Sequence, residues 1–282
     1  MYARSPVIRH RMLQRLLDLF RPRKPFTAYE YRVTKFQLPK DGEVSYAQWQ
    51  HPGEVGKAVL QENVDFFRNW IREGDFVIDI GAHEGDTTVP MALAAGASGL
   101  TLGLEPNPHV FRTLEMNASL NPDKTRIIPL HFAATATDGE FTFGSGDPSY
   151  GNGGIVGFTH NKVRNTRYTM TVQGRNLEKY LLQHHIADLP RLRLIKVDAE
   201  GYDKEIIKNM LGIVRRYRPV ILTEVFGPST DEEKRELFTV LAAEGYSMSS
   251  FIEFIGHPTD VVTLERMTGR KTFNLIAVPM PA

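Results

Sequence analysis

The chain has 282 residues, 41% of them hydrophobic, with a net charge of +1 and no cysteine. This length and composition predict one large α/β domain with an appendage, and they exclude disulfides, thiolate catalysis and thiolate metal sites. No apolar run reaches the roughly eighteen residues of a spanning helix, and no secretory signal is visible at the amino terminus, so we expect an intracellular, cytoplasmic protein.

Basic residues concentrate in the first 25 positions, which hold seven Arg or Lys and one acid, Asp18. The rest of the chain is mildly acidic, which argues against a nucleic-acid partner. Residues 8–20 show helical spacing of apolar residues, and Pro22 and Pro25 end the pattern. Such a helix could lie peripherally on an anionic membrane, but packing against the body or a partner subunit is commoner. We predict a basic amino-terminal extension over residues 1–53 and one main domain over residues 54–282.

Helical and strand patterns alternate from residue 54 onward, which is typical of a parallel sheet. The first half predicts helix 54–72, strand 76–81, helix 86–95, strand 100–105, helix 108–119 and strand 126–133. The glycine-rich stretch 144–154 predicts an irregular, mobile loop. The second half predicts strand 168–172, helix 175–185, strand 192–198, helix 202–211, strand 219–225, helix 231–244 after a capping box at Thr230 and Glu233, and strands near 246–254 and 273–279.

The segment from Asp79 to Gly85 follows the first predicted parallel strand. Gly81 and Gly85 permit a sharp turn and the close approach of a ligand to the backbone. A dinucleotide site would prefer Gly-x-Gly-x-x-Gly, whereas the carboxylates of Asp79 and Glu84 would repel phosphate. They suit a cofactor that bears a cationic amino group. The simpler alternative is a tight turn between a strand and a helix, without a ligand.

Glu105 ends the next predicted strand, 20 residues beyond Gly85. A carboxylate at this place can accept hydrogen bonds from both hydroxyls of a ribose. This feature alone does not separate nicotinamide cofactors from S-adenosylmethionine, and an exposed acid at a strand end is the alternative.

Three segments together resemble the FkbM family of methyltransferases: Ile-Asp-Ile-Gly-Ala-His-Glu-Gly at 78–85, Leu-Glu-Pro-Asn-Pro-His-Val-Phe at 104–111 and Ile-Lys-Val-Asp-Ala-Glu-Gly-Tyr-Asp at 195–203. The resemblance covers residues 75–226. It implies a class I methyltransferase (Rossmann-like) fold, a seven-stranded, mostly parallel sheet with helices on both faces and an antiparallel last strand. It also implies methyl transfer from S-adenosylmethionine to a hydroxyl of a sugar, glycan or natural product. On this match Asp79, Gly81 and Gly85 surround the methionine part of the cofactor, and Glu105 binds its ribose.

Two positions depart from the family pattern. The family frequently has asparagine where His83 stands and an acid where Ala136 stands. We therefore expect His83 to lie beside the cofactor without acting as a base, and backbone near Ala134 to contact the adenine.

Asp198 and Glu200 follow the fourth predicted parallel strand, opposite the sulfonium in the implied fold. Methyl transfer requires an aligned oxygen nucleophile and removal of its proton, and a carboxylate within hydrogen-bond reach does both. We predict Asp198 as this base, with Glu200 or Glu224 assisting, and Lys196 on the same strand face tempering their repulsion. Capping of the next helix is the structural alternative for Asp198 and Glu200. Glu224 could join Asp198 around a divalent metal, but two acids are a weak signal and substrate hydrogen bonding is favoured.

The sequence thus predicts an S-adenosylmethionine-dependent O-methyltransferase, with loop 144–157 closing over the substrate. A scaffold that binds the cofactor without catalysis and acts as an interaction protein is the second hypothesis. A nicotinamide-dependent oxidoreductase is the third, and the glycine spacing disfavours it.

Overall fold

The computed structural model describes residues 24–281 except residue 55 and residues 158–166. The helix predicted over residues 8–20 lies outside the described residues. Among the helices that are described, none is long and apolar enough to cross a membrane.

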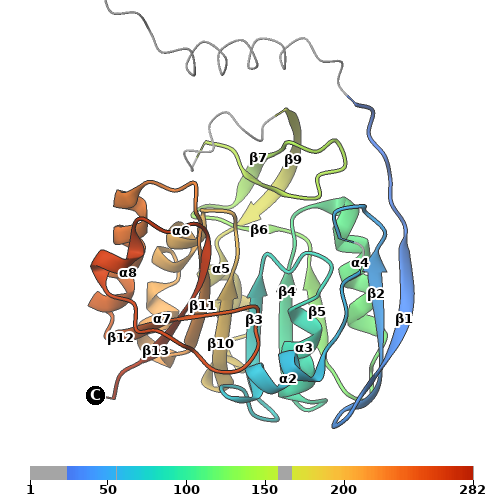
Figure 1. Cartoon of the computed structure of the whole chain (residues 1–282), viewed down its shortest axis with the longest axis horizontal. Coiled ribbons are helices and arrows are strands. Elements are labelled where there is room, and N and C mark those ends of the chain that lie inside the picture. The colour runs from blue at the N-terminus through green and yellow to red at the C-terminus, as the bar shows by residue number, and fades with distance from the viewer. Residues whose placement is uncertain (1–23, 55, 158–166, 282) are drawn as a thin grey trace, which may run out of the picture.

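A seven-stranded sheet forms the centre of the molecule, with the strand order β12-β13-β11-β10-β3-β4-β5 (Figure 1). The strands are β3 (Phe76–Ile80), β4 (Leu100–Leu104), β5 (Ile127–Leu130), β10 (Leu192–Val197), β11 (Val220–Val225), β12 (Tyr246–Phe251) and β13 (Phe273–Pro279). Neighbouring strands are parallel except at β13, which runs antiparallel to β11 and β12. This confirms the predicted sheet with its antiparallel last strand.

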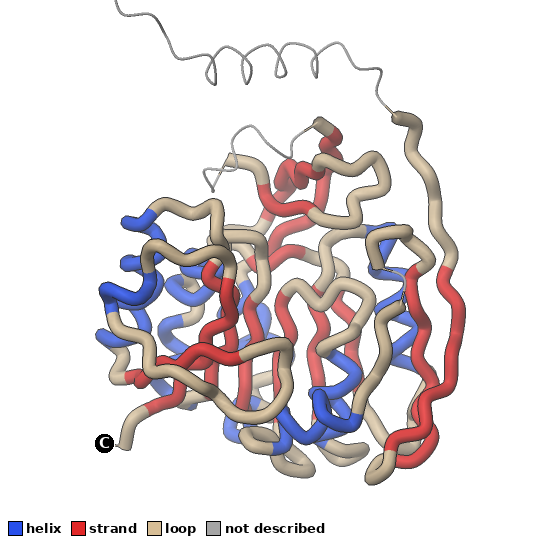
Figure 2. The backbone as a smooth tube through the Cα atoms, viewed as in Figure 1, coloured by secondary structure: helices blue, strands red, loops and turns tan. Residues whose placement is uncertain are grey.

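Helices cover both faces of this sheet and give each face its own core (Figure 2). One core joins Ile78 of β3 to α5 (Leu177–His184), α6 (Asp203–Lys208), α7 (Leu211–Tyr217) and α8 (Asp231–Ala243). The other joins Val77 to α2 (Gln61–Arg68) and α3 (Thr88–Ala95). Beside β5 lies α4 (Pro108–Ser119), and short 3₁₀ helices occur at η1 (Leu189–Arg191) and η2 (Leu264–Met267). Alternate residues of β3 therefore point to opposite faces.

Three predicted elements differ from the structure. The helix expected over 54–72 is only α2, because Gly56 adopts a left-handed φ of +100° and Leu60, directly before α2, is extended, so no helix can run through either residue. The strand expected over 126–133 is split into β5 and the short β6 (Ala133–Ala134), and the helix expected over 202–211 is split into α6 and α7. The capping box of α8 is confirmed, since Thr230 and Glu233 each accept the other's backbone N–H.

A hairpin of β1 (Tyr31–Leu38) and β2 (Gly42–Trp49) lies against the main body, and no sequence pattern predicted it. The side chains of Tyr46 and Trp49 are almost fully buried. The Asn117 amide on α4 accepts the Ala47 N–H at 2.7 Å and donates to the Ala47 carbonyl at 2.8 Å, so it pairs with the strand as another backbone would. The domain boundary at residue 54 stays a prediction, but residues 42–49 pack into the same core as α2 and α3.

A second, four-stranded sheet lies beyond the carboxyl ends of the central parallel strands, above them in Figure 1, with the order β6-β9-β7-β8. It contains β7 (Gly139–Ser145), β8 (Gly153–Ile155) and β9 (Tyr168–Arg175). The prediction of irregular structure over 144–154 is therefore wrong at both ends of that stretch. Its glycines serve close packing instead, because a Cβ on Gly153 would come within 2.4 Å of the Phe143 ring.

Candidate active site

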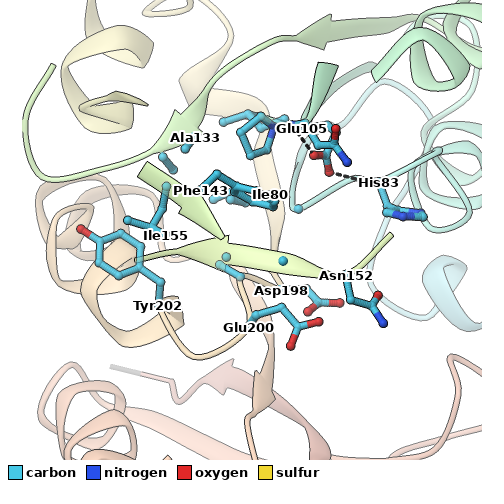
Figure 3. Close-up of a pocket in the computed structure, with 18 of the residues that line it drawn as sticks. Ile80, His83, Glu105, Ala133, Phe143, Asn152, Ile155, Asp198, Glu200 and Tyr202 are labelled. Carbon is cyan, nitrogen blue, oxygen red and sulfur yellow. Dashed lines mark hydrogen bonds between the residues drawn. The ribbon is translucent and has the colours of Figure 1, made fainter. Parts of the chain in front are cut away.

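A cavity of about 260 Å³ lies at the carboxyl ends of β3, β4 and β10, and β8 covers part of it (Figure 3). In parallel α/β sheets ligands bind at this edge. Six of the predicted site residues line the cavity: Gly81, His83, Glu105, Ala134, Asp198 and Glu200. Side chains far apart in the sequence are thus brought into one place.

Gly81 forms the turn at the tip of β3 with a φ of +76°. A Cβ at this position would lie 1.9 Å from the backbone oxygen of Asp198. The same two strand tips are joined by a hydrogen bond from the Asp198 N–H to the Ile80 carbonyl at 3.0 Å. Only glycine lets the β3 turn pass so close to the end of β10.

Asp79 is fully buried and does not line the cavity. Its carboxylate accepts hydrogen bonds from the hydroxyls of Thr87 and Thr88, both at 2.7 Å, and pairs with the Lys196 ammonium at 3.0 Å. Asp79 therefore fixes the start of α3 and holds a lysine of β10. Gly85 also lies outside the cavity lining, beside Leu114.

Glu105 reaches the cavity from the end of β4 with only 6% of its surface exposed. One carboxylate oxygen accepts the His83 N–H at 3.0 Å and the other accepts the Asn107 N–H at 2.7 Å. Burial raises the pKa of Glu105 to about 7, although these two hydrogen bonds oppose the shift. Each oxygen keeps a free lone pair, which suits a pair of ligand hydroxyls.

Asp198 and Glu200 lie side by side at the end of β10 (Figure 3). The Lys196 ammonium is 3.6 Å from Asp198 and also pairs with Asp79, so Lys196 joins the two carboxylates. Burial, followed by the charge of Asp198, raises the pKa of Glu200 to about 7. A carboxylate with such a pKa can exchange a proton near neutral pH.

Glu224 ends β11 next to this pair but outside the cavity lining, in a small neighbouring pocket with Asp203. Burial and the charges of Asp198 and Glu200 raise the pKa of Glu224 to about 8. Among the described residues no group of three acids or histidines could hold a metal ion. The described residues therefore show no metal site that includes Glu224 and Asp198.

His83 lies beside Glu105 with a left-handed φ of +51°. Its Nε2 is 3.2 Å from the Gly151 carbonyl, which it can reach only as a donor, so Nδ1 is the unprotonated nitrogen. Nδ1 is buried and has no hydrogen-bond partner in the described part of the molecule. Burial, followed by the charge of Lys57, lowers the pKa of His83 and keeps the ring neutral.

Sequence reasoning missed a charged group at one end of the cavity, formed by Glu54, Lys57 and Asp86. The Lys57 ammonium lies 2.8 Å from Glu54 and 2.9 Å from Asp86. These carboxylates raise the pKa of Lys57 despite its burial. Asp86 directly follows the Gly81–Gly85 turn and could have been found there, but Glu54 and Lys57 fell within a predicted helix and gave no signal of their own.

The loop between β7 and β8 covers the cavity and is held by three separate elements. His51, just after β2, bonds Asp147 at 2.5 Å. The Asn107 amide at the start of α4 donates to the Tyr150 carbonyl at 2.8 Å, and His83 contacts Gly151. The covering loop is therefore tied to the hairpin, to the β3 turn and to α4.

Backbone strain concentrates around the cavity. Six non-glycine residues of the described chain have positive φ, and four of them line the cavity: His83, Tyr150, Glu200 and Phe254. Left-handed conformations of non-glycine residues are unfavourable and tend to occur at functional sites. This independent feature favours the same cavity as the candidate site.

The strand order, the glycine turn after β3 and the cavity at the strand ends define the class I methyltransferase fold. Residues 79–248 match the family model of the methyltransferase FkbM domain. The chain belongs to the FkbM family of methyltransferases, as its three motifs indicated.

The chain is similar to one curated methyltransferase over about half of its length. The hexuronic acid methyltransferase AglP of Haloferax volcanii is 27% identical over 150 residues, which cover 53% of this chain and 56% of AglP. The chain thus matches little more than half the length of this curated relative.

The fold is similar to that of several solved structures. One is the methyltransferase FkbM of Methylobacillus flagellatus KT, with 14% identity, a TM-score of 0.44 and coverage of 76% of this chain and 50% of that one. An S-adenosylmethionine-dependent O-methyltransferase of Thermotoga maritima has 11% identity, a TM-score of 0.41 and coverage of 89% and 78%.

Proposed function

We propose that this protein transfers a methyl group from S-adenosylmethionine to a hydroxyl oxygen of a sugar, glycan or natural-product acceptor. The observation that carries the proposal is the convergence of Glu105, Asp198 and Glu200 in one cavity beside the glycine turn. FkbM family membership supports methyl transfer. AglP, named as a hexuronic acid methyltransferase, supports an acceptor of the sugar class.

The residues that line the cavity have the chemistry to suit each part of this cofactor. The free lone pairs of Glu105 suit the ribose hydroxyls, and Phe132, Ala133 and Ala134 offer an apolar wall to the adenine. At the other end, Lys57 suits the carboxylate of the methionine part, while Glu54 and Asp86 suit its ammonium. Asp79 does not line the cavity, but its bonds to Thr87, Thr88 and Lys196 hold the start of α3 and the Lys196 side chain in place beside it.

The bound cofactor supplies an electrophilic methyl group on a cationic sulfur. The protein must then align the acceptor oxygen with that methyl and receive the hydroxyl proton. Asp198 and Glu200 are the cavity-lining carboxylates at the end of β10 that can do both, with Glu224 behind them. The covering loop, held by His51, Asn107 and His83, would exclude water from the reacting atoms.

Calorimetric titration with S-adenosylmethionine and, separately, with NAD tests the cofactor. Saturable binding of NAD alone would reject the proposal. Incubation with methyl-labelled cofactor and candidate acceptors, glycans first, followed by mass spectrometry, tests the transfer. If the wild-type protein binds the cofactor but labels none of the candidate acceptors, the scaffold hypothesis is favoured.

A further inference from the structure

Glu200 is held in an unfavourable backbone conformation by its own turn. Its φ is +52°, and the following Gly201 is also left-handed at +96°. The buried carboxylate of Asp203 accepts the Gly201 N–H at 3.0 Å and the Ala199 N–H at 3.3 Å, and the Thr223 hydroxyl donates to it at 3.3 Å. These hydrogen bonds from the turn to Asp203 fix the turn, so that the Glu200 side chain lies in the cavity lining.

Asp198 and Glu200 differ in their partners. Asp198 has the Lys196 ammonium at 3.6 Å, and this cation is itself fixed by Asp79 at 3.0 Å. The Glu200 carboxylate has no hydrogen bond or ion pair with any other described residue, and the like charge of Asp198 acts on it. Glu200 thus lacks the neighbouring cation that Asp198 has, and an unpaired, buried carboxylate beside another carboxylate is a strong base for its type.

We propose that Glu200 receives the proton of the acceptor hydroxyl, while Asp198, held by Lys196, accepts a hydrogen bond from the acceptor and orients it. This inference rests on the proposed methyl transfer. In that step the bond between methyl carbon and sulfur breaks with its electron pair going to sulfur, a bond forms between the acceptor oxygen and the methyl carbon, and the hydroxyl proton passes to a Glu200 oxygen. One positive and one negative charge disappear together, so the cavity gains no net charge.

Neighbouring charges are consistent with this division. The charge of Asp198 acts on Glu200, and the charges of Glu200 and Asp203 act on Glu224 near the end of β11, so three further carboxylates lie in this region. The Lys196 ammonium pairs with Asp198 at 3.6 Å and not with Glu200. Burial and Asp198 raise the pKa of Glu200 to about 7, so an adjacent sulfonium would drive a proton off it and prepare the base.

The test is calorimetric and does not depend on turnover. Binding of S-adenosylmethionine and of S-adenosylhomocysteine, which lacks the positive charge, is measured between pH 5 and pH 9 in buffers of different ionisation enthalpy. The charged cofactor should release up to about half a proton more than the neutral one near pH 7. Both ligands contain the same ribose, so any proton released by Glu105 on ribose binding is the same for both and does not affect the difference in proton release.

Variants assign the released proton. Glu200→Gln should abolish the difference at every pH, whereas Asp198→Asn should keep it and move its maximum to lower pH. Glu253→Gln changes another left-handed glutamate, an exposed one outside the cavity lining, and should behave as wild type. The inference is overturned if Glu200→Gln shows the same difference in proton release as wild type. It is also overturned if only Glu224→Gln loses that difference. Failure of wild-type protein to bind either ligand would instead reject the proposed function.

Discussion

Replacing Gly81 with alanine tests whether the contact between the tips of β3 and β10 builds the site. The added Cβ would meet the Asp198 carbonyl at 1.9 Å, and real Cβ contacts stay beyond 3.0 Å, so the strand tips must move apart. A left-handed alanine costs about 1–2 kcal/mol, overpacking about 1–3 kcal/mol, and loss of the hydrogen bond between Asp198 and Ile80 about 1 kcal/mol. We expect a total destabilisation of roughly 3–6 kcal/mol, which lowers the melting temperature by on the order of 10 °C.

Gly269→Ala is the matched control, because Gly269 has a similar φ of +72° and open space where the Cβ would go. The Gly269→Ala variant should lose only the stability that a left-handed alanine costs, about 1–2 kcal/mol. Both variants are compared by thermal and urea unfolding, and surviving Gly81→Ala protein is titrated with S-adenosylmethionine, whose affinity should fall because Asp198 moves. If Gly81→Ala has the same melting temperature as Gly269→Ala and binds the cofactor with wild-type affinity, the reasoning about the strand tips is wrong.

Three further predictions concern the buried charges. Lys196→Met leaves Asp79 buried without its cation and should lower the unfolding free energy by about 3–5 kcal/mol in denaturant titrations; adding Asp79→Asn should recover part of the loss. Glu105→Gln should weaken S-adenosylmethionine binding about tenfold by calorimetry, because a neutral amide is a poorer acceptor for two hydroxyls, and an unchanged affinity would remove Glu105 from the ribose site. The pKa of Glu224 rises from 4.5 to about 8 on folding, so wild-type stability falls as pH rises through this window. Glu224→Gln should therefore match wild type near pH 4 and melt higher at pH 8; equal melting curves at both pH values would contradict the shift.

The parts of the site that lie at strand ends were predictable from the sequence. Parallel strands alternating with helices must place their carboxyl ends along one edge, so Gly81, Glu105 and Asp198 were expected together before any coordinates. All three line the cavity. Their chemical roles stay predictions, because proximity alone does not show what they bind.

Other parts were not predictable because the pattern did not contain the deciding information. Asp79 was expected at the cofactor, but a strand alternates its side chains and the sequence does not say which face meets α3. In the structure the Asp79 carboxylate bonds Thr87, Thr88 and Lys196, and its place beside the methionine part of the cofactor stays a prediction. Lys57 fell within a predicted helix, but its segment is irregular in the structure, so its position follows from tertiary contacts and not from the helical pattern.

The cavity combines several features that each disfavour the folded protein without a ligand. Glu105 and Glu200 are carboxylates with raised pKa values, and burial is the main cause for both. Glu200 and His83 also adopt left-handed backbone conformations, which cost about 1–3 kcal/mol each. None of these is needed to close the sheet, since the core on each face is apolar and continuous. A ligand that brings a positive charge and hydroxyl groups would relieve the electrostatic part of this cost, which is what we expect of a cavity that binds the proposed cofactor.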